Sequence, residues 1–333
     1  MNQDLTQGRI TSSLLRFAWP FMVGNLLQQL YNVVDTLIVG RYLGSNALGA
    51  VGSSYTLMTF LTSILLGLCM GSGVRFSICC GRRQEALLRR SMVLSFGFIA
   101  LVSVALNVVA FLALDGIIAL LQVPQECRGL MGEYLYVIFF GILATFLYNY
   151  FACLLRALGN STAPLLFLAV SAALNIGLDL LFVLVFSWGV AGAAAATVIA
   201  QYASGIGLMI YTFVRCPQIR IRRADLVYDR RDMVEILQLS TLTSVQQSVM
   251  NFGILMVQGR VNSFGAAVMA AFAAAVKIDS FAYMPVQDFG NAFSTFVAQN
   301  FGAGKEARIR DGIKSAVIAS MAFCLVISLG VFL

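Results

Sequence analysis

The chain has 333 residues, of which 59% are hydrophobic and only 11% charged, and its formal net charge is +7. Soluble domains carry about 25% charged residues, so this composition excludes an ordinary soluble protein. The chain has no histidine, and its seven cysteines show no metal-binding spacing, so we interpret them as small buried hydrophobic residues.

Apolar segments long enough to cross a bilayer core, about 20 residues each, recur along the whole chain. We therefore predict an all-α, polytopic membrane protein with nine membrane-spanning helices. Their approximate ranges are 15–43, 47–79, 92–114, 131–156, 163–186, 190–214, 234–260, 265–300 and 314–333. Residues 1–13 are polar and no removable signal follows them, so the first span is expected to direct insertion itself.

The basic residues predict how the chain is oriented in the membrane. Eighteen of them lie in ends and loops on one side of the predicted spans and three on the other, while Lys277 lies inside a span. The positive-inside rule then places the N-terminus in the cytoplasm. The same sorting argues against nucleic acid as a partner, because the basic segment 215–232 fits a cytoplasmic loop.

Residues 14–86 and 233–307 repeat one pattern. At an offset of 219 and later 221, the matched pairs include Gln28 with Gln247, Asn32 with Asn251, Gly44 with Gly265 and Gly81 with Gly302. Six predicted spans precede the second copy, so both copies enter the membrane in the same direction. We predict an N-lobe of six spans (1–214), a cytoplasmic linker (215–232) and a partial C-lobe of three spans (233–333).

A complete second copy would bring the number of spans to twelve, whereas the chain holds nine. We therefore expect a fragment or a truncated product. A natural nine-span protein is the alternative.

The first predicted span carries a stripe of polar residues spaced three and four apart, which places them on one helical face. They are Asn25, Gln28, Gln29, Asn32, Asp35 and Thr36, and the second copy repeats the stripe at Ser244, Gln247 and Asn251. Because a polar face meets lipid only at a cost, we expect both stripes to line a wet cleft between the halves. Polar contacts between packed helices are the alternative.

Asp35 breaks the symmetry of the repeat, because Ile254 stands at the matching position. A carboxylate at this depth costs roughly 2.5–3.5 kcal/mol on insertion scales, so we expect it to exchange a proton or hold a cation. Asn175 and Asp179 share a face of the fifth span, and Thr197 lies on the sixth. With Asp35 they could supply oxygen atoms to one Na⁺ ion or form a proton network; hydrogen bonding between helices is the alternative.

The eighth predicted span carries Lys277 and Asp288 on one face, with Pro285 between them. About 16 Å of helical rise separates the two charges, which disfavours a direct ion pair, so we expect both to face the cavity. Six aromatic residues are candidates to coat a cavity for flat cations, with simple packing as the alternative: Tyr31, Tyr55, Tyr148, Tyr150, Phe139 and Phe146. The predicted substrate-cavity residues are Gln28, Tyr31, Asn32, Gln247, Asn251, Lys277 and Asp288.

The sequence shows no nucleotide-binding or catalytic pattern. Glu306 follows the Gly302–Lys305 segment, and Gln299 stands where a P-loop has its first glycine. No nucleophile–base pair requires a catalytic role. We expect neither an enzyme nor a bound cofactor, apart from a transported H⁺ or Na⁺.

Three stretches resemble the multidrug and toxic compound extrusion (MATE) transporters of prokaryotes. They are Gln28-Gln-Leu-Tyr31-Asn32-Val-Val-Asp35-Thr-Leu-Ile-Val-Gly40-Arg41 with the preceding Pro20, Leu155-Arg156-Ala-Leu-Gly159-Asn-Ser-Thr-Ala-Pro164, and Gln299-Asn300-Phe-Gly302-Ala303-Gly-Lys305. The resemblance covers essentially the whole chain. It implies two six-helix lobes around a V-shaped cleft, and export of organic cations or drugs from the bacterial cytoplasmic membrane by a monomer, driven by Na⁺ or H⁺ entry.

The resemblance also implies roles for individual residues. The family's coupling aspartate matches Asp35, its Asn-x-x-x-Asp motif matches Asn175 and Asp179, its span-six threonine matches Thr197, its span-one hinge proline matches Pro20, and a cavity tyrosine matches Tyr31. The chain departs from the family in lacking three C-lobe helices. Two alternative functions are a flippase for lipid-linked oligosaccharides of the same superfamily and a non-transporting membrane fragment.

Overall fold

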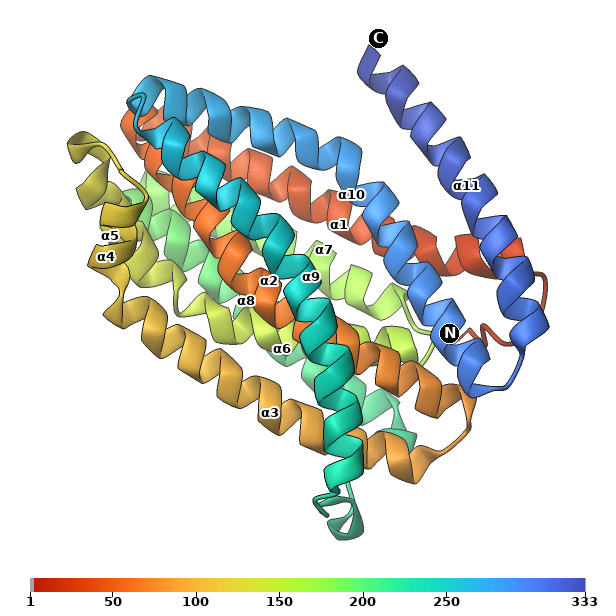
Figure 1. The fold of residues 1–333 in the computed structure, drawn as a ribbon. Helices are drawn as coiled ribbons and strands as arrows, with labels where there is room; N and C mark the ends of the chain where they lie inside the picture. The colour runs from red at the N-terminus through yellow and green to blue at the C-terminus, as the bar shows by residue number, and fades with distance from the viewer. Residues whose placement is uncertain (1–2, 333) are drawn as a thin grey trace.

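The computed structural model describes residues 3–332, apart from the side chains of residues 224, 277–282 and 326–332. The described chain is helical nearly throughout (Figure 1). The elements before the linker are α1 (Ile10–Tyr42), α2 (Ser45–Gly81), α3 (Glu85–Leu112), α4 (Leu114–Leu120), α5 (Gln125–Ile138), α6 (Gly141–Ala157), α7 (Thr162–Asp179), the π-helical segment Leu180–Val185 and α8 (Gly189–Arg215). Short 3₁₀ turns at Pro217–Ile219 and Arg223–Asp225 lead into α9 (Arg230–Asn262), α10 (Ala266–Gly302) and α11 (Glu306–Phe332).

Each predicted span coincides with a helix, except the fourth, which is the pair α5 and α6 bent by 48°. Among the described residues, α2, α3, α7 with its π-helical segment, and α8 are long and apolar enough to cross a membrane, and the bent pair is a fifth if its two helices are counted as one span. The prediction of nine spans therefore stays a prediction. The polar stripes lower the mean hydropathy of α1 and α9, because both helices carry amides on one face and α1 also carries Asp35 there.

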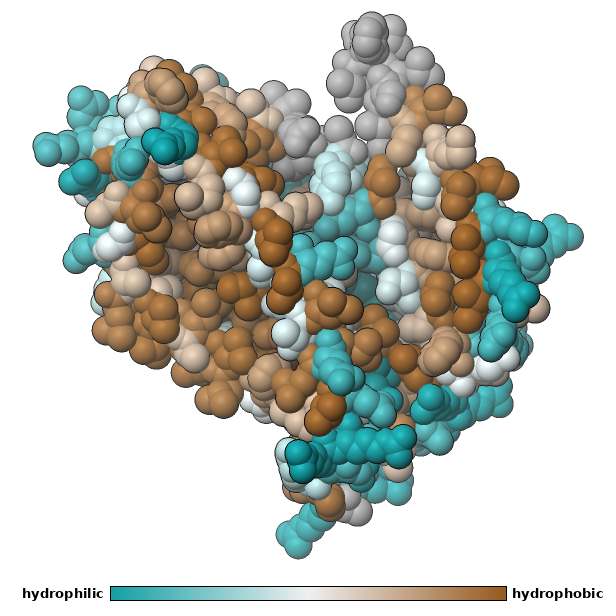
Figure 2. Space-filling model, in the orientation of Figure 1, coloured by the Kyte–Doolittle hydropathy of each residue, from teal (hydrophilic) through white to brown (hydrophobic). Residues whose placement is uncertain are grey.

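Large apolar side chains cover much of the outer surface. Leu101 and Leu112 of α3 are 70% and 83% exposed, and Leu242 of α9 is 71% exposed. Figure 2 shows apolar side chains over most of the visible face, with polar ones gathered at the ends of the bundle. Such a surface suits a bilayer, in which exposed apolar side chains are in contact with lipid.

The structure reproduces the internal repeat. Helices α1 and α9 have 33 residues each, and α2 and α10 have 37 each. Gly44 and Gly265 precede α2 and α10 with φ angles of 90° and 100°, a conformation that favours glycine. The connection between the paired helices is thus the same in both copies.

The two copies exchange helix contacts, because α2 packs on α9 and α10, while α1 packs on α10. At the ends of α2 and α10, a Cβ built on Gly81 would overlap the carbonyl oxygen of Gln299, and one built on Gly302 would overlap that of Ile78. These two contacts are related by the offset of 221. Glycine at both positions therefore lets the two backbones touch.

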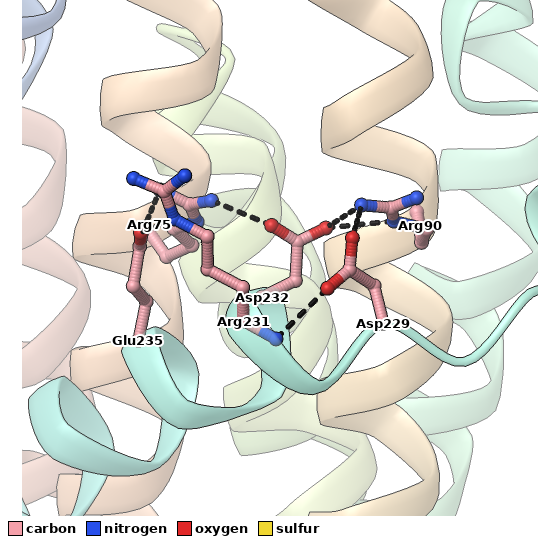
Figure 3. Close-up of polar contacts among 6 residues, drawn as sticks. All are labelled: Arg75, Arg90, Asp229, Arg231, Asp232 and Glu235. Carbon is pink, nitrogen blue, oxygen red and sulfur yellow. Dashed lines mark hydrogen bonds and ion pairs between the residues drawn. The ribbon is translucent and has the colours of Figure 1, made fainter.

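An ion-pair network joins the linker end of α9 to α2 and α3 (Figure 3). Arg75 of α2 contacts Asp232 at 3.1 Å and Glu235 at 2.5 Å. Arg90 of α3 contacts Asp229 and Asp232 at 2.5 Å each. Asp229 also caps α9, because its carboxylate accepts a hydrogen bond from the backbone N–H of Arg231 at 2.8 Å. The start of α9 is thereby fixed to the first copy.

The end of α7 is wider than an α-helix. The backbone N–H of Phe186 donates to the carbonyl oxygen of Leu181, five residues back, at 3.0 Å. Segments of this kind occur mostly as single turns and are frequent at functional sites. Here the widened turn directly follows Asp179.

Candidate functional site

A cavity of about 990 Å³ lies between helices of both copies, lined by α1, α2 and α5–α10. Gln28 and Asn32 of α1 line it, as do Gln247 and Asn251 of α9. Figure 2 shows polar side chains recessed between apolar walls on the visible face. The structure thus places most of both polar stripes on one cavity, and helical periodicity accounts for which side chains face it.

The prediction was wrong for Thr36 and Ser244, which are not among the lining residues. The Ser244 hydroxyl instead donates to the carbonyl oxygen of Ile64 of α2 at 3.0 Å, a polar contact between packed helices.

The asymmetric pair of the repeat also meets at this cavity. Asp35 and Ile254 both line it, and Asp35 is 7% exposed. The second copy therefore supplies a hydrocarbon side chain where the first supplies a carboxyl group.

The predicted coupling residues form one group beside α1. Asp35 and Thr197 line the cavity, whereas Asn175 and Asp179 lie behind them, 1% and 0% exposed. The Asn175 amide donates to the Thr197 hydroxyl at 3.3 Å. Asp179 lies close enough to Asp35 for their charges to interact. The structure thus brings together all four residues that the spacing singled out.

Three oxygen atoms of this group have no hydrogen-bond partner among the described residues. They are Asn175 Oδ1 and both carboxyl oxygens of Asp179. Buried polar atoms are nearly always paired, so unpaired ones need an explanation. A proton, or a hard cation with its preference for oxygen ligands, would satisfy these atoms. The described residues hold no cluster of three or more His, Cys, Asp or Glu of the kind that binds a resident metal.

A second polar group lies at the opposite end of the cavity. The Asn25 amide of α1 donates to Asp288 Oδ1 of α10 at 2.6 Å, and Asp288 is 4% exposed. Asp288 Oδ2 has no partner in the described part of the chain. The Arg156 guanidinium lies 3.7 Å from the centre of the Phe21 ring, a cation–π contact. The four residues form the floor of the cavity.

The remaining predicted residues have varied positions. Of the predicted aromatic residues, Tyr31, Tyr55 and Tyr148 line the cavity. Tyr150, Phe139 and Phe146 are packed in the apolar core instead and are not among the lining residues. Gln247 accepts a hydrogen bond from the Gln287 amide at 3.3 Å. Pro20 lies inside an uninterrupted α1 and is not among the lining residues, so its role as a hinge is untested. Lys277 lies outside the described side chains.

Two of the lining residues that sequence analysis missed lie beside the acidic groups of the cavity. Arg156 was counted with the basic residues of the loops, yet it belongs to the last turn of α6 and faces the cavity. Tyr134 of α5 lies near both Asp35 and Asp179. The signal for Arg156 was its place inside the apolar run Leu154-Leu155-Arg156-Ala157, where a charge needs a polar surrounding. No local signal marks Tyr134.

Comparison with known proteins gives consistent results. The family model MatE matches residues 20–181 and 240–333. The probable multidrug resistance protein YpnP of Bacillus subtilis is 32% identical over 313 residues, which are 92% of this chain and 68% of that protein. The probable multidrug resistance protein YoeA of the same organism is 28% identical, with 95% and 70% covered.

Solved structures show the same fold. A multidrug resistance MATE family transporter of the MOP superfamily, in an outward-facing conformation, aligns with a TM-score of 0.90 and 21% identity, covering 100% of this chain and 75% of that one. A MOP superfamily transporter from Pyrococcus furiosus, described as having a binding pocket of reverse polarity, aligns with a TM-score of 0.84 and 22% identity, covering 98% and 73%.

Proposed function

Because the chain belongs to the MatE family of transporters, we propose that it exports organic cations or drugs across the bacterial cytoplasmic membrane in exchange for H⁺ or Na⁺. The relatives named above are multidrug resistance proteins of a bacterium. The basic residues support an N-terminus in the cytoplasm.

The buried oxygen atoms beside Asp35 carry the coupling part of this proposal. Asp179 is fully buried with both carboxyl oxygens unpaired among the described residues, and it lies next to a second carboxyl group that faces the cavity. Two neighbouring carboxyl groups in a poorly hydrated site favour uptake of a positive charge. We infer that H⁺ or Na⁺ enters this group through Asp35.

The cavity supports the substrate part. Its volume lies at the upper end of the range for drug-sized ligands, about 300–1,000 Å³. Among the charged side chains of its described lining, two are acidic, Asp35 and Asp288, and one is basic, Arg156. Amide side chains from both copies also line it. This lining favours a cationic substrate over the anionic headgroup that a flippase for lipid-linked oligosaccharides would carry.

In the proposed cycle, an organic cation binds in the cavity while the group around Asp35 is negative. Entry of H⁺ or Na⁺ neutralises that group, α1 changes shape near Pro20, and the substrate leaves on the outer side. Proline removes one backbone hydrogen bond from a helix, which makes Pro20 a suitable bending point. The coupling ion must bind the two states with different affinity, since otherwise it shifts no equilibrium.

Asp35→Asn tests the proposal. We expect efflux of a fluorescent organic cation from energised cells to fall by about tenfold or more, because an amide cannot take up the coupling charge. The matched control is Asp311→Asn, which makes the same change at an exposed position of α11. Imposing a pH gradient or a Na⁺ gradient on vesicles identifies the coupling ion. Undiminished efflux by Asp35→Asn, at equal protein level, would refute the assignment.

A further inference from the structure

The segment before α1, residues 3–8, lies across the turns of both halves of the molecule. The backbone N–H of Gln3 donates to the carbonyl oxygen of Gly159, in the turn between α6 and α7, at 2.9 Å. The backbone N–H of Leu5 donates to Gln299 Oε1 of α10 at 3.2 Å. We call residues 3–8 the strap.

The other end of the strap is held by the turn between α10 and α11. The Asn300 amide donates to the carbonyl oxygen of Leu5 at 3.2 Å, and the Lys305 ammonium donates to that of Thr6 at 2.8 Å. Arg308 donates to the carbonyl oxygens of Gln7 at 2.6 Å and Gly8 at 2.7 Å. All of these donors bind backbone carbonyl oxygens of the strap, so they fix the path of its backbone independently of its side chains.

The turn between α6 and α7 is shaped to let the strap pass. Gly159 has a φ angle of 82°, and a Cβ on it would overlap the carbonyl oxygen of Gln3. The Gln299 amide also donates to the carbonyl oxygen of Ala157 at 2.8 Å. The Leu155–Pro164 and Gln299–Lys305 stretches, which the function proposed above leaves unused, therefore meet at the strap.

One side chain of the strap belongs to the apolar cluster beside the floor of the cavity. Leu5 is 0% exposed and belongs to an apolar cluster with Phe17, Phe296 and Ala292. Phe17 and Ala292 also line the cavity. Leu5 and its cluster thus separate the cavity from the end of the bundle that carries the basic residues.

We propose that the strap is the cytoplasmic gate of the transporter: Leu5 seals the floor of the cavity, and the strap must leave the turn between α10 and α11 before substrate can enter from the cytoplasm. This inference rests on the function proposed above, because it supplies the access step of the same cavity. The strap is well placed for this role, because it is held by backbone contacts that can be exchanged for water and by a single buried leucine.

Cys153 provides a native reporter for the gate, since it lines the cavity on α6, one turn before Arg156. Inside-out membrane vesicles are treated with a membrane-impermeant maleimide, and labelling of Cys153 is followed by site-resolved mass spectrometry. We expect Leu5→Asp to raise the labelling rate by about tenfold or more, because loss of one buried leucine shifts the open–closed equilibrium by at least that factor. Right-side-out vesicles should show no such rise.

Leu226→Asp is the matched control, because it introduces the same change at a leucine of the linker that is 61% exposed. Should Leu5→Asp fail to fold, the double variant Lys305→Gln/Arg308→Gln removes donors to the strap and leaves its leucine in place. Hydrogen exchange at the amides of Gln3 and Leu5 then reports whether the strap has been released. Released amides with unchanged Cys153 labelling would overturn the gate.

The same experiment separates the gate from the proposed function. If Cys153 labelling follows the strap but the wild-type chain exports no organic cation, the gate stands and the transport proposal fails. If the chain exports cations and the Cys153 labelling rate is unchanged in the strap variants, the gate proposal alone is wrong. A rise confined to right-side-out vesicles would overturn the cytoplasmic placement of the gate.

Discussion

The repeat creates two equivalent helix interfaces, α2 on α9 and α10 on α1, and they are built differently. In the first, Gly67 and Gly71 of α2 press against the backbone of α9 at Ser244 and Ser240, where a Cβ on either glycine would overlap it. The matching positions of α10 are Asp288 and Ala292. Asp288 accepts a hydrogen bond from Asn25 of α1. Both Asp288 and Ala292 line the cavity.

The ends of the two interfaces differ in the same sense. Arg75 of α2 forms buried ion pairs with the start of α9, whereas the matching residue of α10, Phe296, belongs to the apolar cluster with Phe17 of α1. The interface of α2 with α9 is stabilised by close backbone contact and by buried ion pairs. The interface of α10 with α1 is stabilised by the Asn25–Asp288 hydrogen bond and by apolar packing beside the cavity. We infer that α2 and α9 form the fixed interface and that α1 and α10 form the one that rearranges.

Arg75→Phe, which places at position 75 the residue type of the matching Phe296, is expected to have the largest effect on stability. Removing one partner from a buried ion pair costs about 3–5 kcal/mol, and Asp232 would keep only Arg90. Thermal unfolding of the detergent-solubilised protein measures this loss. Arg231→Phe, at a side chain that is 89% exposed, serves as control. A melting temperature for Arg75→Phe equal to that of the control would remove the distinction between the interfaces.

Gly71→Leu should destabilise the protein by about 1–3 kcal/mol, because the new side chain has to displace the α9 backbone. Gly97→Leu is the matched control: Gly97 is also helical, and a Cβ there meets nothing within 4 Å. Leucine is a better helix former than glycine, so the control should be neutral or stabilising. Ala292→Leu should be milder than Gly71→Leu, and the reverse order would contradict the comparison.

Asp288→Asn addresses the rearranging interface without breaking it. An amide can still accept from Asn25, but the negative charge is lost. We expect the dissociation constant for a monovalent organic cation to rise by about tenfold, equivalent to about 1.4 kcal/mol. Equilibrium binding of a fluorescent cation to purified protein measures it. The melting temperature should hardly move, which distinguishes lost recognition from lost packing.

The smallest effect at neutral pH comes from titrating the linker carboxylates. The backbone N–H of Arg231 and the charge of Arg90 hold the pKa of Asp229 below its ordinary value. Burial pushes the pKa of Asp225 up, but the backbone N–H of Arg222 and the Arg89 guanidinium outweigh it and leave that pKa lowered.

A lowered folded-state pKa adds stability that is present above the unfolded pKa, about 3.9, and is lost as pH falls through the folded value. The melting temperature should therefore not respond to these groups between about pH 5 and 8, and should drop below about pH 4. Asp229→Asn keeps the helix cap but removes one titrating group, so its acid decline should be shallower. An identical decline would show that Asp229 does not contribute.

Local periodicity predicted much of this molecule. Steps of three and four residues placed Gln28, Asn32, Gln247 and Asn251 on faces that the structure turns to one cavity. The same rule paired Asn175 with Asp179 on α7. The repeat predicted that α9 and α10 would copy α1 and α2.

Contacts between distant segments could not be predicted in this way. Asn25 and Asp288 are 263 residues apart, and neither helix's pattern indicates which turn meets which. The strap has no periodicity, and its partners Gln299 and Arg308 lie 294 and 303 residues after Leu5. Only the packing of the whole bundle decides such pairs.

The π-helical segment after Asp179 holds one residue more than an α-helical path of the same course requires. Were it to tighten into α geometry, everything beyond Val185 would advance by about 1.5 Å and rotate by about 100° relative to α7. The extra residue of this segment therefore lies directly beside the carboxyl pair of Asp35 and Asp179. A change of charge at Asp179 would act directly beside this segment, which leads through residues 186–188 into α8 with its Thr197.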